Sequence, residues 1–168
     1  MANTFQNING MTVNQTNAGL TVGTGVNYTT AVTTSCVIKG KFATTLGAQT
    51  NTATPTVDAT TGASFTLTPL GAQQGTVFVY GTNLAGAIKV AQGSIVATEL
   101  GVTTTAGAWI VAPQFPALPD DFCPIGYQLI RTSPTGAAFT MGVTSMALSG
   151  LNVTTVNVHT LPDRPAIA

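Results

Sequence analysis

The sequence predicts an all-β protein, a β-sandwich or β-barrel-like domain with an extended N-terminal arm, and three features of its composition support this class. Threonine, a β-branched residue that suits strands, supplies 32 of the 168 residues. The 18 glycines and 9 prolines divide the chain into short segments. Charged residues, which usually cover the exposed faces of helices, make up only 6% of the chain, whereas about 25% is usual for a soluble domain.

Residues 1–30 are rich in Asn, Thr and Gly, and their apolar residues, among them Phe5 and Ile8, are sparse. A segment of this kind buries too little apolar surface to fold alone. We therefore expect residues 1–30 to form an N-terminal arm that lies on a neighbouring subunit, with ordinary edge strands as the alternative. Residues 31–168 are long enough for a single β domain with its own core, and this domain should end in an extended, proline-containing tail.

The first half of this domain contains one segment with the composition of a central strand. Residues 76–80 (TVFVY) are apolar on both faces and, with the turn and the apolar residues that follow up to residue 96, predict a β-hairpin. Before it, residues 31–42 predict a strand, and residues 65–68 (FTLT) alternate as a half-buried strand should. Residues 47–64 have almost no large apolar side chain, so we expect an exposed loop there.

The second half alternates predicted strands with a proline-rich segment. Residues 108–112 and 126–131 predict two strands. Residues 113–124 carry four prolines, and because proline lacks the N–H that a central strand needs, we expect an extended segment that crosses the domain. Polar and apolar residues alternate over 139–143 and again over 156–159, which predicts two further strands.

The charge pattern argues against several classes of partner. The five basic and five acidic residues cancel, and only Lys39 and Lys41 lie close together in the sequence, so we expect no nucleic-acid binding. No apolar run reaches the 18 or so residues of a membrane-spanning helix, and the first ten residues lack the features of a secretion signal. We therefore expect a protein that contacts no membrane and is assembled in the cytoplasm. A surface of Thr, Asn and Gln costs little to desolvate, which favours a role in a larger assembly.

The residues that usually carry catalysis form no recognisable pattern, so we expect neither an enzyme nor a cofactor. His159, the single histidine, lies near the end of the last predicted strand and should pair with backbone or with Asp163. Cys36 and Cys123 are expected to be free buried thiols, with a disulfide or metal ligation as the alternatives. Zinc sites need four ligands at close spacing, which this chain does not offer.

Four stretches of the chain, taken together, resemble small virion structural proteins of tailed bacteriophages, especially capsid decoration (cement) proteins. These stretches are residues 48–63 (AQTNTATPTVDATTGA), 75–95 (GTVFVYGTNLAGAIKVAQGSI), 112–127 (APQFPALPDDFCPIGY) and 160–165 (TLPDRP). The resemblance covers most of the chain from about residue 45 onward. It implies a β-rich protein, often a homotrimer, that sits on the lattice of the major capsid protein and reinforces it.

Composition and resemblance together predict a non-enzymatic protein of the virion that binds the outside of a phage capsid. A component of the phage tail or fibre is the first alternative. A carbohydrate-binding β-sandwich, with Trp109, Tyr80 or Tyr127 as stacking platforms, is the second.

The candidate partner-contact residues are Phe5 and Ile8 in the N-terminal segment and Asp163 and Arg164 in the tail. Asp163 and Arg164 form a charged pair between prolines in a chain that has few charges. Either they lie in solvent, or Arg164 makes a hydrogen-bonded contact with a neighbouring subunit.

Overall fold

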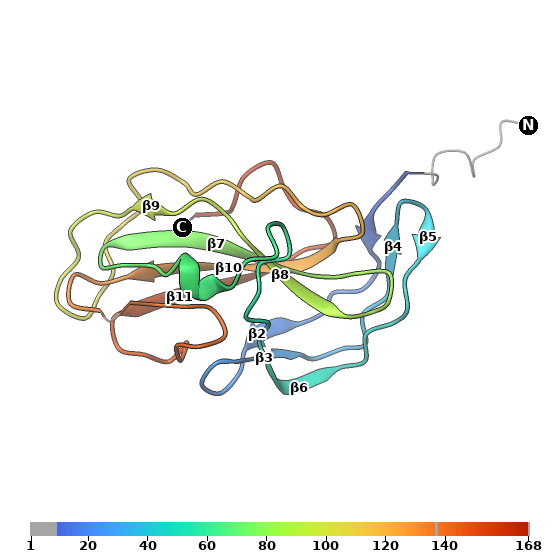
Figure 1. The fold of residues 1–168 in the computed structure, drawn as a ribbon, viewed down its shortest axis with the longest axis horizontal. Helices are drawn as coiled ribbons and strands as arrows, with labels where there is room; N and C mark the ends of the chain where they lie inside the picture. Colours follow the sequence, from blue (N-terminus) through green and yellow to red (C-terminus); the bar gives the residue numbers. More distant parts are fainter. Residues whose placement is uncertain (1–9, 137, 168) are drawn as a thin grey trace, which may run out of the picture.

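The computed structural model describes residues 10–136 and 138–167 and confirms the all-β class. These residues form three antiparallel sheets and contain no α-helix (Figure 1). The central sheet has the order β11-β10-β7-β8, and β9 pairs with the start of β7. Its strands are β7 (Gln74–Thr82), β8 (Ile88–Gln92), β9 (Val96–Ala97), β10 (Cys123–Thr132) and β11 (Leu151–Asn157).

Two smaller sheets contain the strands of the N-terminal third of the chain. One has the order β1-β4-β5 and the other the order β2-β3-β6. The strands of the first are β1 (Val13–Asn14), β4 (Cys36–Ile38) and β5 (Lys41–Phe42), and those of the second are β2 (Leu20–Val22), β3 (Asn27–Thr30) and β6 (Gln49–Ala53). In Figure 1 the β4–β5 hairpin lies at one end of the long axis, and β9 lies towards the other.

The central strands β7 and β10 are buried on both faces of their sheet, as the apolar sequence of β7 predicts. On one face, Phe78, Tyr80 and Ile130 join a core cluster that also contains Leu20 and Tyr28 from the β2-β3-β6 sheet. The opposite face carries a second cluster, which includes Val77, Val79, Tyr127 and Leu129. The molecule is therefore layered, with the central sheet as its middle layer.

The second face is covered by irregular chain rather than by another sheet. Phe115 and Leu118 of the proline-rich segment and Leu161 of the tail pack against the second cluster. The Phe115 ring meets the Tyr127 ring edge-on, with centroids 5.1 Å apart. The crossing segment predicted at residues 113–124 is confirmed for 113–122, which contain no strand, and Figure 1 shows it running along the central sheet. The prediction is wrong for Cys123 and Pro124, which begin β10.

The predicted hairpin at residues 76–96 is confirmed as β7 and β8, and the strand predicted at 126–131 is confirmed within β10. A β-bulge lies between Pro124 and Gly126, where the register of β10 against β7 shifts. Pro124 pairs with Gly81 of β7 alone, because the pairing of β10 with β11 begins at Gly126, so the proline lies where β10 has a neighbour on one side only.

Four predictions of local structure are wrong. Residues 47–64 include the polar strand β6, and residues 65–67 form a 3-10 turn whose N-cap, Ser64, accepts a hydrogen bond from the Thr66 N–H. Residues 139–143 contribute one isolated bridge and a turn, and 108–112 contribute only the bridge between Trp109 and Thr98. The two alternating segments fail for a common reason. An irregular turn buries Phe65 in the first segment and Phe139 and Met141 in the second, which produces the same local pattern as a half-buried strand.

The described part of the N-terminal segment forms strands rather than an arm. Leu20 in β2 and Tyr28 in β3 are fully buried, and Asn14 in β1 pairs with Cys36 in β4. The arm expected over residues 1–30 is therefore wrong for residues 13–30, where β1 and β2 occupy the ends of their sheets as edge strands. Polar residues such as Asn14 are accepted in these strands because backbone groups satisfy them. Phe5 and Ile8 lie outside the described residues.

Candidate functional site

The side chains of His159, Cys36 and Asp58 are engaged in structural contacts. No cluster of three or more His, Cys, Asp and Glu that suits a metal ion occurs among the described residues. The backbone N–H of Asn14 donates to the carbonyl of His159 at 2.9 Å, and the His159 Nδ1 lies 2.8 Å from the carbonyl of Asn14. His159 thus pairs with backbone, the first of the two partners expected for it, and joins the end of the last strand to β1.

Two of the three aromatic side chains expected as sugar platforms, Tyr80 and Tyr127, are fully buried and cannot stack on a sugar. Trp109 is half-buried: it packs against the second core cluster, and the guanidinium carbon of Arg131 lies 5.5 Å from the centre of its ring. Of the residues named for the carbohydrate-binding alternative, Trp109 alone stays a candidate. No helix in the described parts of the chain has the length and apolar character needed to cross a bilayer.

A loop of residues 98–111 carries the largest concentration of exposed aliphatic side chains. The exposed fractions are 79% for Leu100, 71% for Val102, 60% for Ile110 and 62% for Val111. Glu99 is the only charged residue in this loop. Apolar side chains gathered in this way on a surface mark sites of interaction with other proteins.

The backbone of this loop is anchored, although its side chains are exposed. The Glu99 N–H donates to the carbonyl of Ala108 at 2.9 Å, and Thr98 pairs with Trp109 as a β-bridge. The Arg131 Nη1 donates to the carbonyl of Gly107 at 2.7 Å. Burial lowers the pKa of Arg131 from its ordinary value. The loop therefore presents its apolar side chains on a fixed backbone, which reduces the entropy lost on binding.

Two glycines allow the two sides of this loop to approach closely. A Cβ atom at Gly107 would collide with the carbonyl of Glu99, and a Cβ atom at Gly101 would collide with the carbonyl of Thr105. The sequence signal for the loop was thus present: aliphatic residues flanked by glycines and interrupted by a Thr run. The apolar run at residues 108–112 predicted a strand instead, because consecutive apolar residues are usually buried.

A groove next to this loop contains the two predicted tail residues. It has a volume of about 490 Å³, and its lining includes Val111 and Phe115 on one side and Asp163 and Arg164 on the other. Val111 belongs both to the 98–111 loop and to this groove. We call the loop and the groove together the candidate partner surface.

The tail is held in place around Arg164. Pro165 is buried, and the Ala166 N–H donates to the Tyr127 hydroxyl at 2.9 Å. The side chains of Asp163 and Arg164 are exposed. Whether Arg164 reaches a neighbouring subunit stays a prediction, but the tail fixes the position of its backbone.

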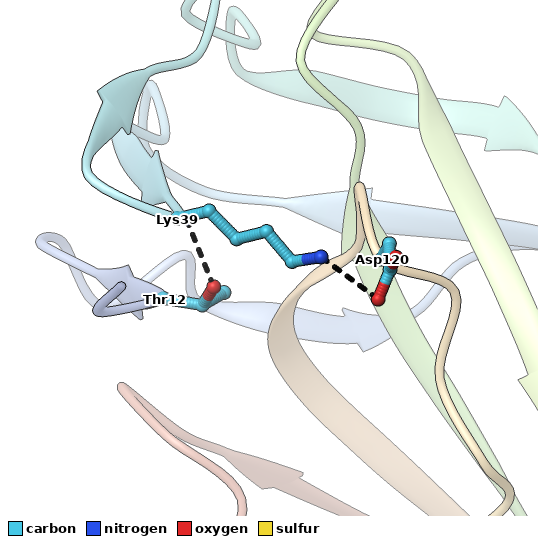
Figure 2. A network of polar contacts seen from close by, with 3 residues as sticks. All are labelled: Thr12, Lys39 and Asp120. Carbon is cyan, nitrogen blue, oxygen red and sulfur yellow. Dashed lines mark hydrogen bonds and ion pairs between the residues drawn. The ribbon is translucent and has the colours of Figure 1, made fainter. Parts of the chain in front are cut away.

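The chain enters its described part at the opposite end of the molecule, beside the β4–β5 hairpin. Figure 2 shows Thr12, Lys39 and Asp120 at this junction. The Lys39 N–H donates to the Thr12 hydroxyl at 3.2 Å, and the Lys39 Nζ lies 2.9 Å from an Asp120 carboxylate oxygen. Lys39 and Gly40 both have positive φ, as the two central residues of a tight hairpin turn require. The ion pair is exposed and contributes only about 0–1 kcal/mol.

Comparison of the chain with protein-family models, with curated proteins and with solved structures finds no match.

Proposed function

We propose that this chain is a non-enzymatic structural protein of a phage virion, which binds the outside of the capsid and reinforces its lattice. The observation that carries the proposal is the candidate partner surface, an anchored apolar surface in a chain with almost no charge. Its partners would be the major capsid protein and further copies of the chain, most simply as a homotrimer. It would be assembled onto the capsid in the host cytoplasm.

The physical basis of this proposal is the low cost of covering the exposed aliphatic side chains of the 98–111 loop. Burial of Leu100, Val102, Ile110 and Val111 removes apolar surface from water and leaves no ion without its solvent. A specific interface buries about 800 Å² on each partner. Many copies of such an interface on a shell add their effects, so each contact can be weak while the whole lattice is strengthened.

The function would be mechanical. A protein that contacts two adjacent capsid subunits adds buried area across their joint, and this area must be exposed before the subunits separate. The attachment of the 98–111 loop suits this task, because a force applied at the loop would reach the central strand β10 through the hydrogen bond from Arg131 to the carbonyl of Gly107.

Mass spectrometry of purified virions, with heads and tails separated, tests this proposal. The chain should be recovered with the heads, in a fixed ratio to the major capsid protein. Recovery with the tails would support the alternative of a tail or fibre component. Absence from both fractions would overturn the proposal.

A further inference from the structure

The two cysteines of the chain meet in its interior, although more than half of the sequence separates them. Cys36 in β4 and Cys123 at the start of β10 belong to one core cluster, with exposed fractions of 2% and 0%. Both are free. Cys123 lies opposite Thr82 in the register of β7 and β10, and the Thr82 hydroxyl donates to the Cys36 Sγ at 3.4 Å. The two cysteines are therefore neighbours across the boundary between the β1-β4-β5 sheet and the central sheet.

The β-bulge in β10 is what turns Cys123 towards Cys36. Tyr127 and Leu129 point to the second core cluster, so strict alternation would send Cys123 to that face as well. The extra residue between Pro124 and Gly126 reverses this alternation, and Cys123 instead lies opposite Thr82 in the register of β7 and β10. Cys123 thus joins the first cluster, where Cys36 is.

Two polar side chains fix the Cys36 thiol at this junction. The Thr82 hydroxyl donates to the Cys36 Sγ at 3.4 Å, and the Cys36 thiol donates to the Asn14 Oδ1 at 3.8 Å. A cysteine that only fills space needs no such partners. The two contacts hold the Cys36 sulfur in one position, close to Cys123.

We propose that Cys36 and Cys123 are a latent disulfide, which a low-molecular-weight disulfide such as oxidised glutathione closes. The Cys36 thiolate attacks one sulfur of the oxidant, forms a mixed disulfide and displaces one glutathione thiolate. Cys123 then loses its proton and attacks the Cys36 Sγ, which releases the second glutathione. The two protein thiols give up two electrons, and the oxidant is reduced to two molecules of glutathione.

The roles of the two sulfurs follow from their surroundings. The hydrogen bond from Cys123 lowers the pKa of Cys36 to about 7, against the effect of burial, and the Thr82 hydroxyl lowers it further. The same hydrogen bond, together with burial, raises the pKa of Cys123. Cys36 is therefore the attacking thiolate and Cys123 the thiol that resolves the mixed disulfide. Because both are buried, the reaction waits for a local opening of the β4 segment.

The new bond would tie the β1-β4-β5 sheet covalently to the central sheet. It closes a long loop of chain, which restricts the unfolded state strongly. This inference concerns the stability of the fold and does not depend on the proposed function, so either can fail without the other.

The test uses the full chain, purified in the reduced state and incubated with oxidised glutathione without denaturant. Both thiols should disappear together, and the intact mass should fall by two hydrogen atoms. A tryptic digest should then contain peptide 1–39, which holds Cys36, linked to peptide 90–131, which holds Cys123. The midpoint of thermal unfolding should rise by about 5–10 °C and return when the bond is reduced.

Three results would overturn the proposal: thiols that stay free after prolonged incubation, a stable adduct with glutathione, or a disulfide between two chains. Cys36→Ser and Cys123→Ser serve as controls, and neither should gain thermal stability from the oxidant. The comparison of the reduced and oxidised natural chain decides the question even where a serine variant folds poorly.

Discussion

In this chain, threonine hydroxyls bind backbone groups that charged side chains often bind in other proteins. The hydroxyl of Thr76 donates to the carbonyls of Gly93 and Ser94, and that of Thr132 donates to those of Gly71 and Gln74. These bonds fasten loops to the central strands without placing an ion in the interior. A hydroxyl satisfies backbone groups at a smaller desolvation cost than a charge. Threonine therefore contributes hydrogen bonds to the fold, in addition to favouring strands.

Thr132→Val tests the contribution of these hydrogen bonds, because valine has the same shape and lacks the hydroxyl. Thr132 is fully buried, and it also accepts a hydrogen bond from the Gln74 N–H at 3.0 Å. We expect the substitution to lower the free energy of unfolding by about 1–3 kcal/mol, the cost of leaving buried backbone groups unpaired. Urea denaturation measures it. Thr154→Val, on the exposed face of β11, is the matched control and should change stability by at most about 0.5 kcal/mol. Equal effects at both positions would contradict this account.

The buried tyrosines predict a loss of stability at alkaline pH. Burial raises the pKa of Tyr28 to about 12, and it also raises the pKa of Tyr80, whose ring centre lies 5.8 Å from that of Tyr28. An unfolded tyrosine ionises near pH 10, so the native state binds these protons more tightly than the unfolded state. The resulting stability is complete below about pH 10 and is lost as the pH rises towards 12, by up to about 3 kcal/mol for Tyr28.

Unfolding midpoints and phenolate absorbance, recorded together across this pH range, measure that loss. Tyr28→Phe is the control, because phenylalanine keeps the ring and cannot ionise. This variant should lose less stability between pH 10 and 12 than the natural chain. Phenolate absorbance that rises fully near pH 10 while the fold persists would show that these hydroxyls reach solvent.

At the scale of elements, apolar content on both faces was the signal that the sequence carried most clearly. It predicted β7, because a buried central strand needs such residues. The turn and the apolar residues after β7 predicted β8, and the segment 126–131 predicted a strand that lies within β10. β6 was missed because its residues, QTNTA, are held by pairing with β3 rather than by burial. Because backbone hydrogen bonds do not depend on the type of side chain, a strand held by pairing alone cannot be recognised from its composition. Of the candidate partner surface, the sequence analysis named Asp163 and Arg164. It did not find the 98–111 loop, because consecutive aliphatic residues in a sequence usually indicate a buried strand.

The 98–111 loop should bind a partner without contributing to the stability of the fold. The double substitution Leu100→Gln and Val102→Thr removes apolar surface from two residues that are 79% and 71% exposed. We expect an unchanged unfolding midpoint and at least a tenfold loss of binding to capsids, since burial of each such side chain contributes about 1.5–3 kcal/mol. Leu67→Gln, at a residue 74% exposed outside this loop, is the control and should bind normally. An equal loss in both variants would argue against a specific role for the loop.

Arg164 in the tail, which lines the groove and is exposed, leads to a separate prediction. If Arg164 contacts a carboxylate or carbonyl on a neighbour, Arg164→Ala should lower the temperature at which the assembly dissociates, because loss of a buried partner typically costs about 2–5 kcal/mol. Arg164→Lys should recover only part of this, since lysine cannot bridge two acceptors in one plane. Calorimetry of the assembly measures the dissociation temperature of both variants. An unchanged dissociation temperature for Arg164→Ala would place the tail in solvent.

At the scale of the whole molecule, the two faces of the central sheet are covered by different kinds of structure. The β2-β3-β6 sheet covers one face, and the proline-rich segment and the tail cover the other. The second covering is irregular, and it leads directly into the candidate partner surface through Val111 and Arg164. Within the described residues the only ion pair is the exposed one between Lys39 and Asp120. The described part of the fold is thus held together mainly by apolar contacts and neutral hydrogen bonds.

Cosedimentation of the purified chain with DNA-free capsids, prepared from the virions in which mass spectrometry finds the chain, tests the proposed function. The experiment is done at low and high sodium chloride and shows whether the chain binds a capsid through uncharged contacts. We predict that the chain pellets with the capsids and saturates at a fixed ratio to the capsid protein. Occupancy should change little with salt, because surface ion pairs contribute only about 0–1 kcal/mol each. A chain that stays in the supernatant at every concentration, or an occupancy that collapses as salt is added, would contradict capsid binding of this kind.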